Sequence, residues 1–247
     1  MAEGLEVAHD DYAPGRWDPE LRLAKARKIE ALLRSRCNLT DARILDVGTG
    51  SGIIAASLAK AVGPRGEVIG TDVRDQRQVR DGFEYVQVTD TVLPFDESSF
   101  DVVVTNHVIE HVGDRDAQLE HLLEIRRVLR PEGSFYLATP NRWTVMEPHF
   151  RLPFLSWLPS AAQTPYVRLF RRGSDYDCRL LTRPDLQRLF QLARLEWDDQ
   201  TVDAMRVMAA VERPGLAART ILTAPEAFLR VVRGVIPTMV FLGRRSP

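Results

Sequence analysis

The segment that most limits how this chain can fold is an apolar run leading directly into three glycines. Residues 44–52 read Ile-Leu-Asp-Val-Gly-Thr-Gly-Ser-Gly. Glycine has no Cβ, so glycines at 48, 50 and 52 let the backbone turn sharply and approach a ligand closely. The apolar residues at 53–56 and 58–59 then favour a helix behind the turn. The segment predicts a strand, a glycine turn and a helix, the unit with which α/β proteins bind nucleotides.

Two departures from the dinucleotide pattern limit the nature of the ligand. The pattern G-x-G-x-x-G would need its third glycine at position 53, where this chain has Ile53. Asp46, two residues before the first glycine, would repel a pyrophosphate and attract a cationic group. An NAD(P)-dependent oxidoreductase is therefore the second alternative. The glycines by themselves also fit a turn that binds no ligand and has only a structural role, and this alternative remains.

A second acid ends the next predicted strand. Residues 67–72 read Glu-Val-Ile-Gly-Thr-Asp, and Asp72 lies 20 residues beyond Gly52. A ribose-binding acid occupies this place after one βαβ unit, so Asp72 is predicted to accept both ribose hydroxyls. The structural alternative is a turn or helix-capping acid. A third strand is predicted over residues 83–88, and Asp90 after it is a candidate for binding an adenine amino group.

The segment 93–111 carries a longer succession of motifs. It contains Leu-Pro-Phe at 93–95, Ser-Phe-Asp at 99–101, an unbroken valine strand at 102–104 and Glu-His at 110–111. With the glycine turn, this succession resembles the class I S-adenosylmethionine-dependent methyltransferases, especially those of ubiquinone and menaquinone biosynthesis. The resemblance covers residues 40–142 well and 180–247 by pattern. One departure is that Asp90 stands three steps before Leu93, where the family usually has four.

The resemblance implies the cofactor and the reaction. S-adenosylmethionine would donate a methyl group to a small, hydrophobic or hydroxyl-bearing acceptor and leave as S-adenosylhomocysteine. Asn106 would face the methionyl end of the cofactor, because ligands of open parallel sheets collect at the carboxyl ends of the strands. A non-catalytic cofactor-binding protein is a third alternative. The predicted cofactor-binding residues are Asp46, Gly48, Thr49, Gly50, Gly52, Asp72, Val73, Asp90 and Asn106.

The resemblance also implies a fold. We expect one α/β domain over residues 1–247, with a Rossmann-like, doubly wound seven-stranded sheet, helices on both faces and an antiparallel last strand. Its parts would be a helical cover (1–40), a cofactor-binding core (41–142) and lid insertions on the substrate side (143–178 and 203–236). Helices are predicted over 21–33, 114–130, 182–192 and 216–235, and later strands over 135–139, 195–197 and 237–243. Tyr12 and Trp17 would close over the cofactor or pack partly in the core.

Histidines offer two kinds of chemistry. If Asn106 opens a helix, His107, Glu110 and His111 share one face of it. Imidazole is a poor magnesium ligand, so we expect no metal there, and Glu110 and His111 would orient the methionyl group or cap local backbone. For a hydroxyl acceptor, His149 is the first candidate base, being the only histidine in the insertion 143–178, and His107 is the second. The structural alternative for either is a hydrogen-bonded ring.

The insertion 143–178 is rich in aromatic residues, prolines and flanking arginines. This mixture favours a lid for a lipophilic acceptor, with peripheral contact to a membrane. A small satellite core or a homodimer contact is the alternative.

Composition narrows the function classes further. The net charge is −1, the pI is near 6.5 and the arginines are dispersed, so no nucleic acid partner is expected. Only Cys37 and Cys178 are present, far apart, which gives no sign of a disulfide framework. With no basic leader and no apolar run of membrane-spanning length, we expect a cytoplasmic protein.

Overall fold

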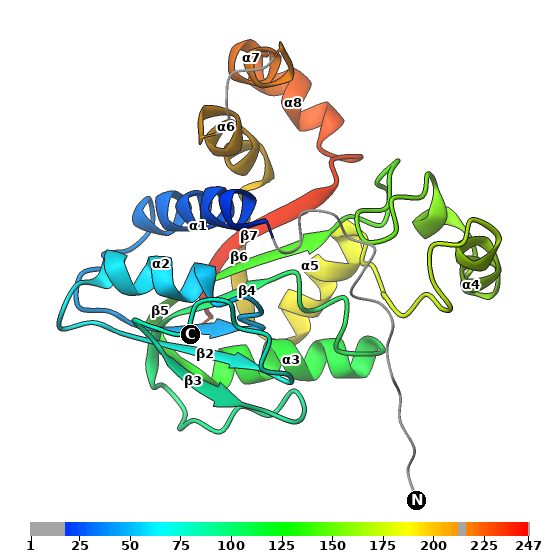
Figure 1. Ribbon diagram of the computed structural model, residues 1–247. Coiled ribbons are helices and arrows are strands. Elements are labelled where there is room, and N and C mark those ends of the chain that lie inside the picture. The colour runs from blue at the N-terminus through cyan, green and yellow to red at the C-terminus, as the bar shows by residue number, and fades with distance from the viewer. Residues whose placement is uncertain (1–17, 212–215, 247) are drawn as a thin grey trace, which may run out of the picture.

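The protein is built around one seven-stranded sheet. The computed structural model describes residues 18–211 and 216–246, and the strand order is β3-β2-β1-β4-β5-β7-β6 (Figure 1). β7 pairs antiparallel with both β5 and β6, while the other pairs are parallel. The predicted Rossmann-like sheet with an antiparallel last strand is therefore confirmed. The strands are β1 (Arg43–Val47), β2 (Glu67–Asp72), β3 (Glu84–Gln87), β4 (Phe100–Asn106), β5 (Leu129–Pro140), β6 (Leu195–Asp199) and β7 (Thr238–Arg245).

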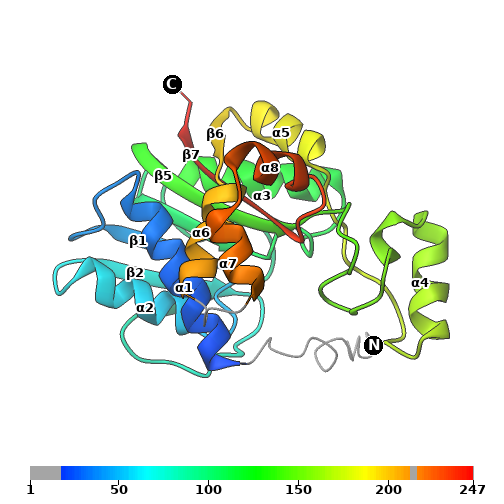
Figure 2. The ribbon, with the colours of Figure 1, turned by 90° about the horizontal axis from the view of Figure 1, so that it is seen from above.

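Helices cover both faces of the sheet, as Figures 1 and 2 show. One face carries α1 (Pro19–Arg34), α2 (Ile53–Val62) and α6 (Thr201–Val211), and the other carries α3 (Arg115–Val128) and α5 (Arg183–Leu192). Ile29 and Leu58 are fully buried on the first face, and Leu122 and Phe190 on the second. Each such side chain contributes roughly 1.5–3 kcal/mol through burial. The two layers hold the strand ends in fixed positions.

Capping residues set the helix starts. Asp18 accepts hydrogen bonds from the first turn of α1, and Asp114 does the same for α3. Thr182 forms a capping box with Asp185 at the start of α5. The helices predicted over 21–33 and from Thr182 to 192 are confirmed, with ends within two residues. Tyr12 and Trp17 lie outside the described residues.

No helix begins at Asn106, so the predicted helical face for His107, Glu110 and His111 is wrong. β4 runs through Asn106, and His107 then takes the left-handed φ of 62°. The His107 N–H donates to the carbonyl of Ala138 on β5 at 2.8 Å. This contact keeps the backbone along the sheet, and the chain turns through His111 before Asp114 starts α3.

Two other predicted elements differ in extent. β5 begins at Leu129, before the predicted 135–139, because Leu129 already pairs with Phe100 ahead of a bulge that contains Pro131. The helical stretch predicted over 216–235 is two helices, α7 (Leu216–Thr223) and α8 (Glu226–Val232), separated at Pro225. Proline has no backbone N–H and cannot continue a helix through that point.

An insertion follows β5, as predicted. It contains a short 3-10 helix, η1 (Leu155–Trp157), and α4 (Ser160–Leu169), and it stands apart from the helices that cover the sheet (Figures 1 and 2). Its small core includes Phe150, Leu155 and Val167. In the second predicted insertion, 203–236, α6 packs on α1, and a role of that segment in acceptor binding stays a prediction. Among the helices described, none has the length and apolar character needed to cross a membrane.

Candidate functional site

The predicted cofactor residues gather at the carboxyl ends of the central parallel strands. Val47 of β1 pairs with Thr71 of β2 and with Thr105 of β4. The N–H groups of Gly48 and Thr49 both donate to the carbonyl of Thr71, at 2.8 and 2.9 Å. The turn after β1 is therefore fixed against the tip of β2, at the edge where open α/β sheets bind ligands.

The three positions of this turn require glycine for different structural reasons. Gly48, Gly50 and Gly52 have φ values of 71°, 51° and 78°. A Cβ at Gly48 would lie 2.3 Å from Cγ2 of Val108, and one at Gly52 would lie 2.2 Å from the carbonyl oxygen of Val79. A Cβ at Gly50 would have Nη1 of Arg22, 3.9 Å away, as its nearest heavy atom outside the adjoining residues. The space beside Gly50 is open, so this is the point of the turn where another group can approach the backbone closely.

A buried acid lies under the turn. Asp46 is 1% exposed and accepts a hydrogen bond from Thr49 Oγ1 at 2.8 Å. Burial raises the pKa of Asp46 to about 7, although the Thr49 hydrogen bond and the charge of Arg22 act in the opposite direction. Thr49 is itself buried and its hydroxyl supports Asp46, and its contact with a cofactor stays a prediction.

Asp72 lies at the tip of β2, as predicted for a ribose acid. Its Oδ2 accepts the Gly50 N–H at 2.8 Å, and its Oδ1 accepts the Arg74 N–H at 3.3 Å. The carboxylate therefore borders the open side of the glycine turn. Val73 follows with its side chain 53% exposed, beside the same strand tip.

Asn106 and Asp90 have different surroundings. Asn106 follows Thr105 at the end of β4, and its buried Oδ1 has no hydrogen-bond donor within the described part of the chain. Asp90 is exposed in the loop after β3, where its Oδ1 accepts the Val92 N–H at 2.8 Å. The site therefore gathers Asp46, Asp72 and Asn106, while Asp90 closes its own turn and its adenine contact stays a prediction. Three acceptor groups around an open glycine cradle fit a cofactor with a ribose diol and positive charge.

The loop after β4 builds a second group of polar side chains around Glu110. Glu110 is 0% exposed and accepts a hydrogen bond from Thr139 Oγ1 at 3.0 Å. Its other oxygen, Oε1, lies 3.4 Å from His107 Nδ1 without hydrogen-bond geometry. Burial would raise the pKa of Glu110, but His107 and the neighbouring His111 and His149 outweigh it and hold the pKa at about 2. Burial lowers the pKa of His107 to about 4.

His149 enters this group from the insertion. Its Nδ1 lies 2.7 Å from Oε1 of the buried Glu147, and its Nε2 lies 3.9 Å from Glu110 Oε1. Its ring packs edge-on against His111, with centroids 5.0 Å apart. Cys178 lies 3.9 Å from His111 Nδ1, and burial raises the pKa of its thiol. The two histidines predicted as bases therefore flank one buried carboxylate.

Four polar residues near the site were not found from the sequence: Arg22, Lys25, Glu147 and Cys178. Arg22 lies beside Gly50, and the pKa of Lys25 is lowered by burial and by Arg22 while Glu110 acts against the shift. Only three lysines occur in the chain. The spacing of Lys25 three residues after Arg22, within a predicted helix, was the one signal that the sequence offered. Glu147 and Cys178 reach the site only through the folding of the insertion.

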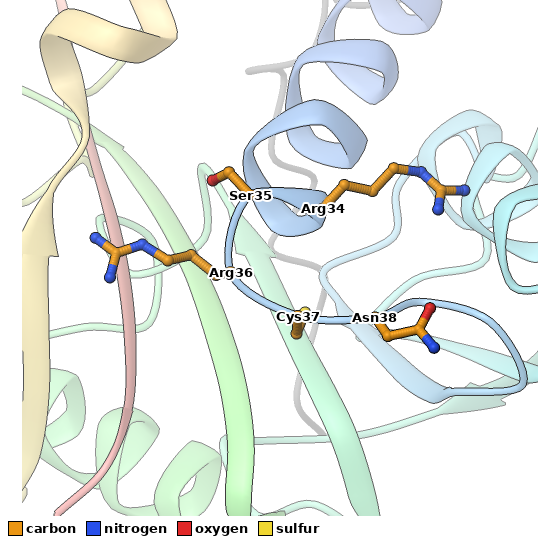
Figure 3. Close-up of a pocket in the computed structure, with 5 residues that line it drawn as sticks. All are labelled: Arg34, Ser35, Arg36, Cys37 and Asn38. Atoms are coloured by element: carbon orange, nitrogen blue, oxygen red, sulfur yellow. The ribbon is translucent and has the colours of Figure 1, made fainter.

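A surface hollow lies near the other end of β1, away from the glycine turn. It is lined by residues 34–38, which connect the end of α1 to the region before β1 (Figure 3). The predicted site lies beyond the carboxyl end of β1, after Val47. The hollow contains none of the predicted site residues.

Comparison with known proteins agrees with this geometry. A family model described as a methyltransferase domain matches residues 45–137. A ubiquinone/menaquinone biosynthesis C-methyltransferase of Pseudomonas putida is 33% identical over 184 residues, which cover 69% of this chain and 65% of that protein. A demethylmenaquinone methyltransferase of Lactococcus lactis is 29% identical over 175 residues, covering 64% and 66%. The chain spans between 30% and 66% of the length of the curated relatives compared.

A solved structure shares the fold. It is the geranyl diphosphate C-methyltransferase from Streptomyces coelicolor, crystallised with Mg²⁺, geranyl diphosphate and S-adenosyl-L-homocysteine. The TM-score is 0.53 at 16% identity, and the match covers 88% of this chain and 78% of that one. At this identity the likeness supports the architecture alone.

Proposed function

Residues 45–137 make this chain a member of the class I S-adenosylmethionine-dependent methyltransferases, and on this premise we propose that it methylates a lipophilic, hydroxyl-bearing acceptor. The observation that carries the proposal is the open space beside Gly50, bordered by Asp72, with Asp46 buried beneath the turn and Asn106 at the end of β4, where its Oδ1 has no hydrogen-bond partner among the described residues. The NAD(P) alternative loses support for two reasons. The buried carboxylate of Asp46 would repel a pyrophosphate, and Ile53 occupies the position of the third glycine in the dinucleotide pattern.

Each acceptor group matches one part of the cofactor. Asp72 would bind the ribose hydroxyls at the strand tip. Asn106 Oδ1 would accept from the methionyl ammonium and so satisfy a buried oxygen that lacks a donor among the described residues. Asp46 would supply negative charge below the turn, which favours a ligand bearing both an ammonium and a sulfonium.

Exposed aromatic side chains support a lipophilic acceptor. Trp143, Phe154 and Trp157, called here the aromatic patch, are 45%, 46% and 41% exposed. Trp157 packs edge-on against each of the other two, at centroid distances of 5.7 and 5.0 Å. The patch belongs to the insertion that follows the carboxyl end of β5, where an acceptor would reach the cofactor. The P. putida relative is named as a C-methyltransferase of ubiquinone and menaquinone biosynthesis, which supports a small-molecule acceptor.

The patch would also contact a membrane surface, from which a lipophilic acceptor is collected. Arg151, Arg168, Arg171 and Arg172 accompany the aromatic side chains along the insertion, a mixture suited to an interface with anionic lipid. Co-sedimentation with anionic and neutral vesicles tests this step. Equal absence from both pellets would contradict it.

The reaction would be an in-line displacement at the sulfonium methyl. The acceptor nucleophile forms the new bond to the methyl carbon while the carbon–sulfur bond breaks, and the sulfur leaves as the neutral thioether of S-adenosylhomocysteine. Much of the acceleration would come from positioning, a contribution of up to about 7–11 kcal/mol. The acceptor proton would pass to Nε2 of His149, whose Nδ1 Glu147 holds. His107, with its low pKa, is the second candidate.

Two measurements test the function. Calorimetry should detect binding of S-adenosylmethionine and S-adenosylhomocysteine and none of NAD, and binding of NAD alone would reverse the assignment. Turnover should then be measured on a panel of long-chain phenols and quinols against their short-chain analogues. Methylation of the long-chain compounds is expected, whereas cofactor binding without any turnover would favour the non-catalytic alternative.

A further inference from the structure

Three side chains from separate segments meet beside the Glu110 group. His111 lies in the loop after β4, His149 in the insertion after β5, and Cys178 in the segment before α5. One ring nitrogen of each histidine and the sulfur of Cys178 all lie within 4.8 Å of one another. We propose that these three side chains bind a zinc ion.

The donor set suits zinc. Zn²⁺ prefers imidazole and thiolate ligands, and three protein ligands leave a fourth tetrahedral position for a small oxygen ligand. In such a site, neighbouring ligand atoms lie roughly 3.3–3.6 Å apart, given Zn–N and Zn–S bonds of about 2.0 and 2.3 Å. Cys178 Sγ and His111 Nδ1 are 3.9 Å apart. Closing the triad therefore requires side-chain movements of about 1 Å or less.

A buried carboxylate already orients one of the ligands. Glu147 Oε1 lies 2.7 Å from His149 Nδ1, and Glu147 Oε2 accepts the N–H groups of His149 and Phe150. A carboxylate can only accept, so Glu147 engages a proton on Nδ1 of His149 and leaves Nε2 as the ring nitrogen that can bind a metal ion. Zinc-binding histidines are commonly held by a carboxylate in this way.

A second observation points to a cation at this place. Glu110 Oε1 is buried and makes no hydrogen bond of good geometry among residues 18–211 and 216–246, and it lies 3.4 Å from His107 Nδ1 and 3.9 Å from His149 Nε2. A negatively charged oxygen without a donor is costly in a low-dielectric interior. A metal ion bound to Nε2 would place positive charge beside it.

The segments that carry the triad are already tied together. Gln118 Nε2 donates to the carbonyls of Ile109 and Arg179, and the Arg179 N–H donates to the carbonyl of Glu110. The loop after β4 and the Cys178 segment therefore stay in register without the metal. This inference does not rest on the methyl-transfer proposal. Zinc and an acceptor proton would use the same Nε2 lone pair, so a zinc-loaded molecule would transfer no proton through His149.

The experiment uses the full chain, reduced and freed of metal by a chelator. Zn²⁺ is titrated in competition with a chromophoric chelator, and Co²⁺ is added as a spectroscopic probe in a parallel sample. One equivalent of metal should bind, and Co²⁺ should give a thiolate-to-cobalt charge-transfer band in the near ultraviolet. The absence of stoichiometric binding, or a cobalt spectrum without the thiolate band, would overturn the proposal.

Variants locate the site. Glu147→Gln should weaken zinc binding about 10–100-fold, since it removes the carboxylate that orients His149. Cys178→Ser should weaken it further and abolish the charge-transfer band. Cys37→Ser is the matched control, because Cys37 lies near the other end of β1, away from the glycine turn, beside the hollow of residues 34–38. It should bind zinc like the unaltered protein.

Binding of S-adenosylhomocysteine to every variant serves as the check on folding. If Cys178→Ser and Cys37→Ser lose zinc equally, the site is misassigned. If Cys178→Ser does not fold, the cobalt spectrum of the unaltered chain decides alone. Zinc binding without S-adenosylhomocysteine binding would contradict the proposed function and leave the metal site intact, so the two failures are distinguishable.

Discussion

At the scale of single residues, the sequence predicted which side chains gather at the strand ends better than which side chains gather around the insertion. Asp46, Gly50 and Asp72 lie together because Asp46 is near the end of β1, Gly50 follows β1 and Asp72 ends the neighbouring β2, and sequence spacing carries that information. Glu147 and Cys178 could not be predicted, because they meet His149 through an insertion with its own small core. Periodicity along the chain does not encode that meeting.

The buried position of Asp46 should make cofactor affinity depend on pH. Its pKa is about 7 in the free protein, and a cationic cofactor prefers the ionised form. Affinity for S-adenosylmethionine should therefore rise close to tenfold between about pH 6 and pH 7.5. Titration calorimetry across this range measures it. Asp46→Asn is the control, and its weaker binding should be flat with pH. A sloping profile in that variant would assign the effect to another group.

Asp72→Ala should weaken S-adenosylmethionine binding by roughly 1.5–3 kcal/mol, because it removes charged hydrogen bonds to the ribose. The loss includes some ordering of the turn, since Asp72 also accepts the Gly50 N–H. Equilibrium binding to the folded variant measures the change. Asp198→Ala is the matched control, as Asp198 lies in β6 and pairs with Arg36. Equal affinities of the two variants would remove Asp72 from the cofactor site.

Gly50→Val should abolish cofactor binding, since the side chain would fill the open cradle and strain a φ of 51°. Gly63→Val separates the loss of space for the cofactor from the backbone strain. Gly63 also has a positive φ, 80°, and a Cβ there would meet nothing within 4 Å. This control should lose stability and keep its affinity for S-adenosylhomocysteine. Normal binding by Gly50→Val would make the glycine turn purely structural.

At the scale of elements, strands and capped helices followed local signals, and errors arose where a distant contact decided the backbone. Thr182 and Asp185 form the capping box of α5 within four residues, so that start could be predicted. The turn at His107 depends on a hydrogen bond to Ala138, 31 positions away. The i, i+3, i+4 spacing of His107, Glu110 and His111 therefore indicated a helix that does not form.

The aromatic patch should govern the acceptor and leave the cofactor alone. Phe154→Ala with Trp157→Ala removes two half-exposed rings from the insertion, so affinity for S-adenosylhomocysteine should be unchanged while turnover of lipophilic acceptors falls. Binding calorimetry and steady-state kinetics measure the two properties. Leu192→Ala, an exposed apolar residue at the end of α5, is the control and should retain turnover. Simultaneous loss of cofactor binding and thermal stability would place the patch in the core.

At the scale of the whole molecule, the site lowers the stability of the fold that carries it. The pKa of Asp46 rises from an ordinary 3.8 to about 7 on folding. The unfolded chain therefore ionises first, and the free energy of unfolding decreases as the pH rises through this interval.

Asp46→Asn should remove this penalty and increase the free energy of unfolding by up to a few kcal/mol at a pH near 8. The amide oxygen can still accept from Thr49, so the hydrogen bond is kept. Denaturant unfolding at that pH and near pH 4 measures the effect, which should be much smaller in acid. A destabilised variant at the higher pH would show that the carboxylate is better compensated than its burial indicates.

The antiparallel β7 has a consequence for how such a protein can diversify. Because β7 runs against β5, the chain leaves β5 and enters β7 at the same edge, where Pro140 pairs with Thr238 and Asn141 binds the carbonyl of Gly234. The long connection after β5 and the long connection before β7 are therefore rooted side by side, outside β1, β2 and β4. Their loops can lengthen, shorten or exchange while the hydrogen bonds around Gly50 and Asp72 stay untouched. On the proposed function, acceptor preference becomes a module that selection can alter without rebuilding the methyl donor's site.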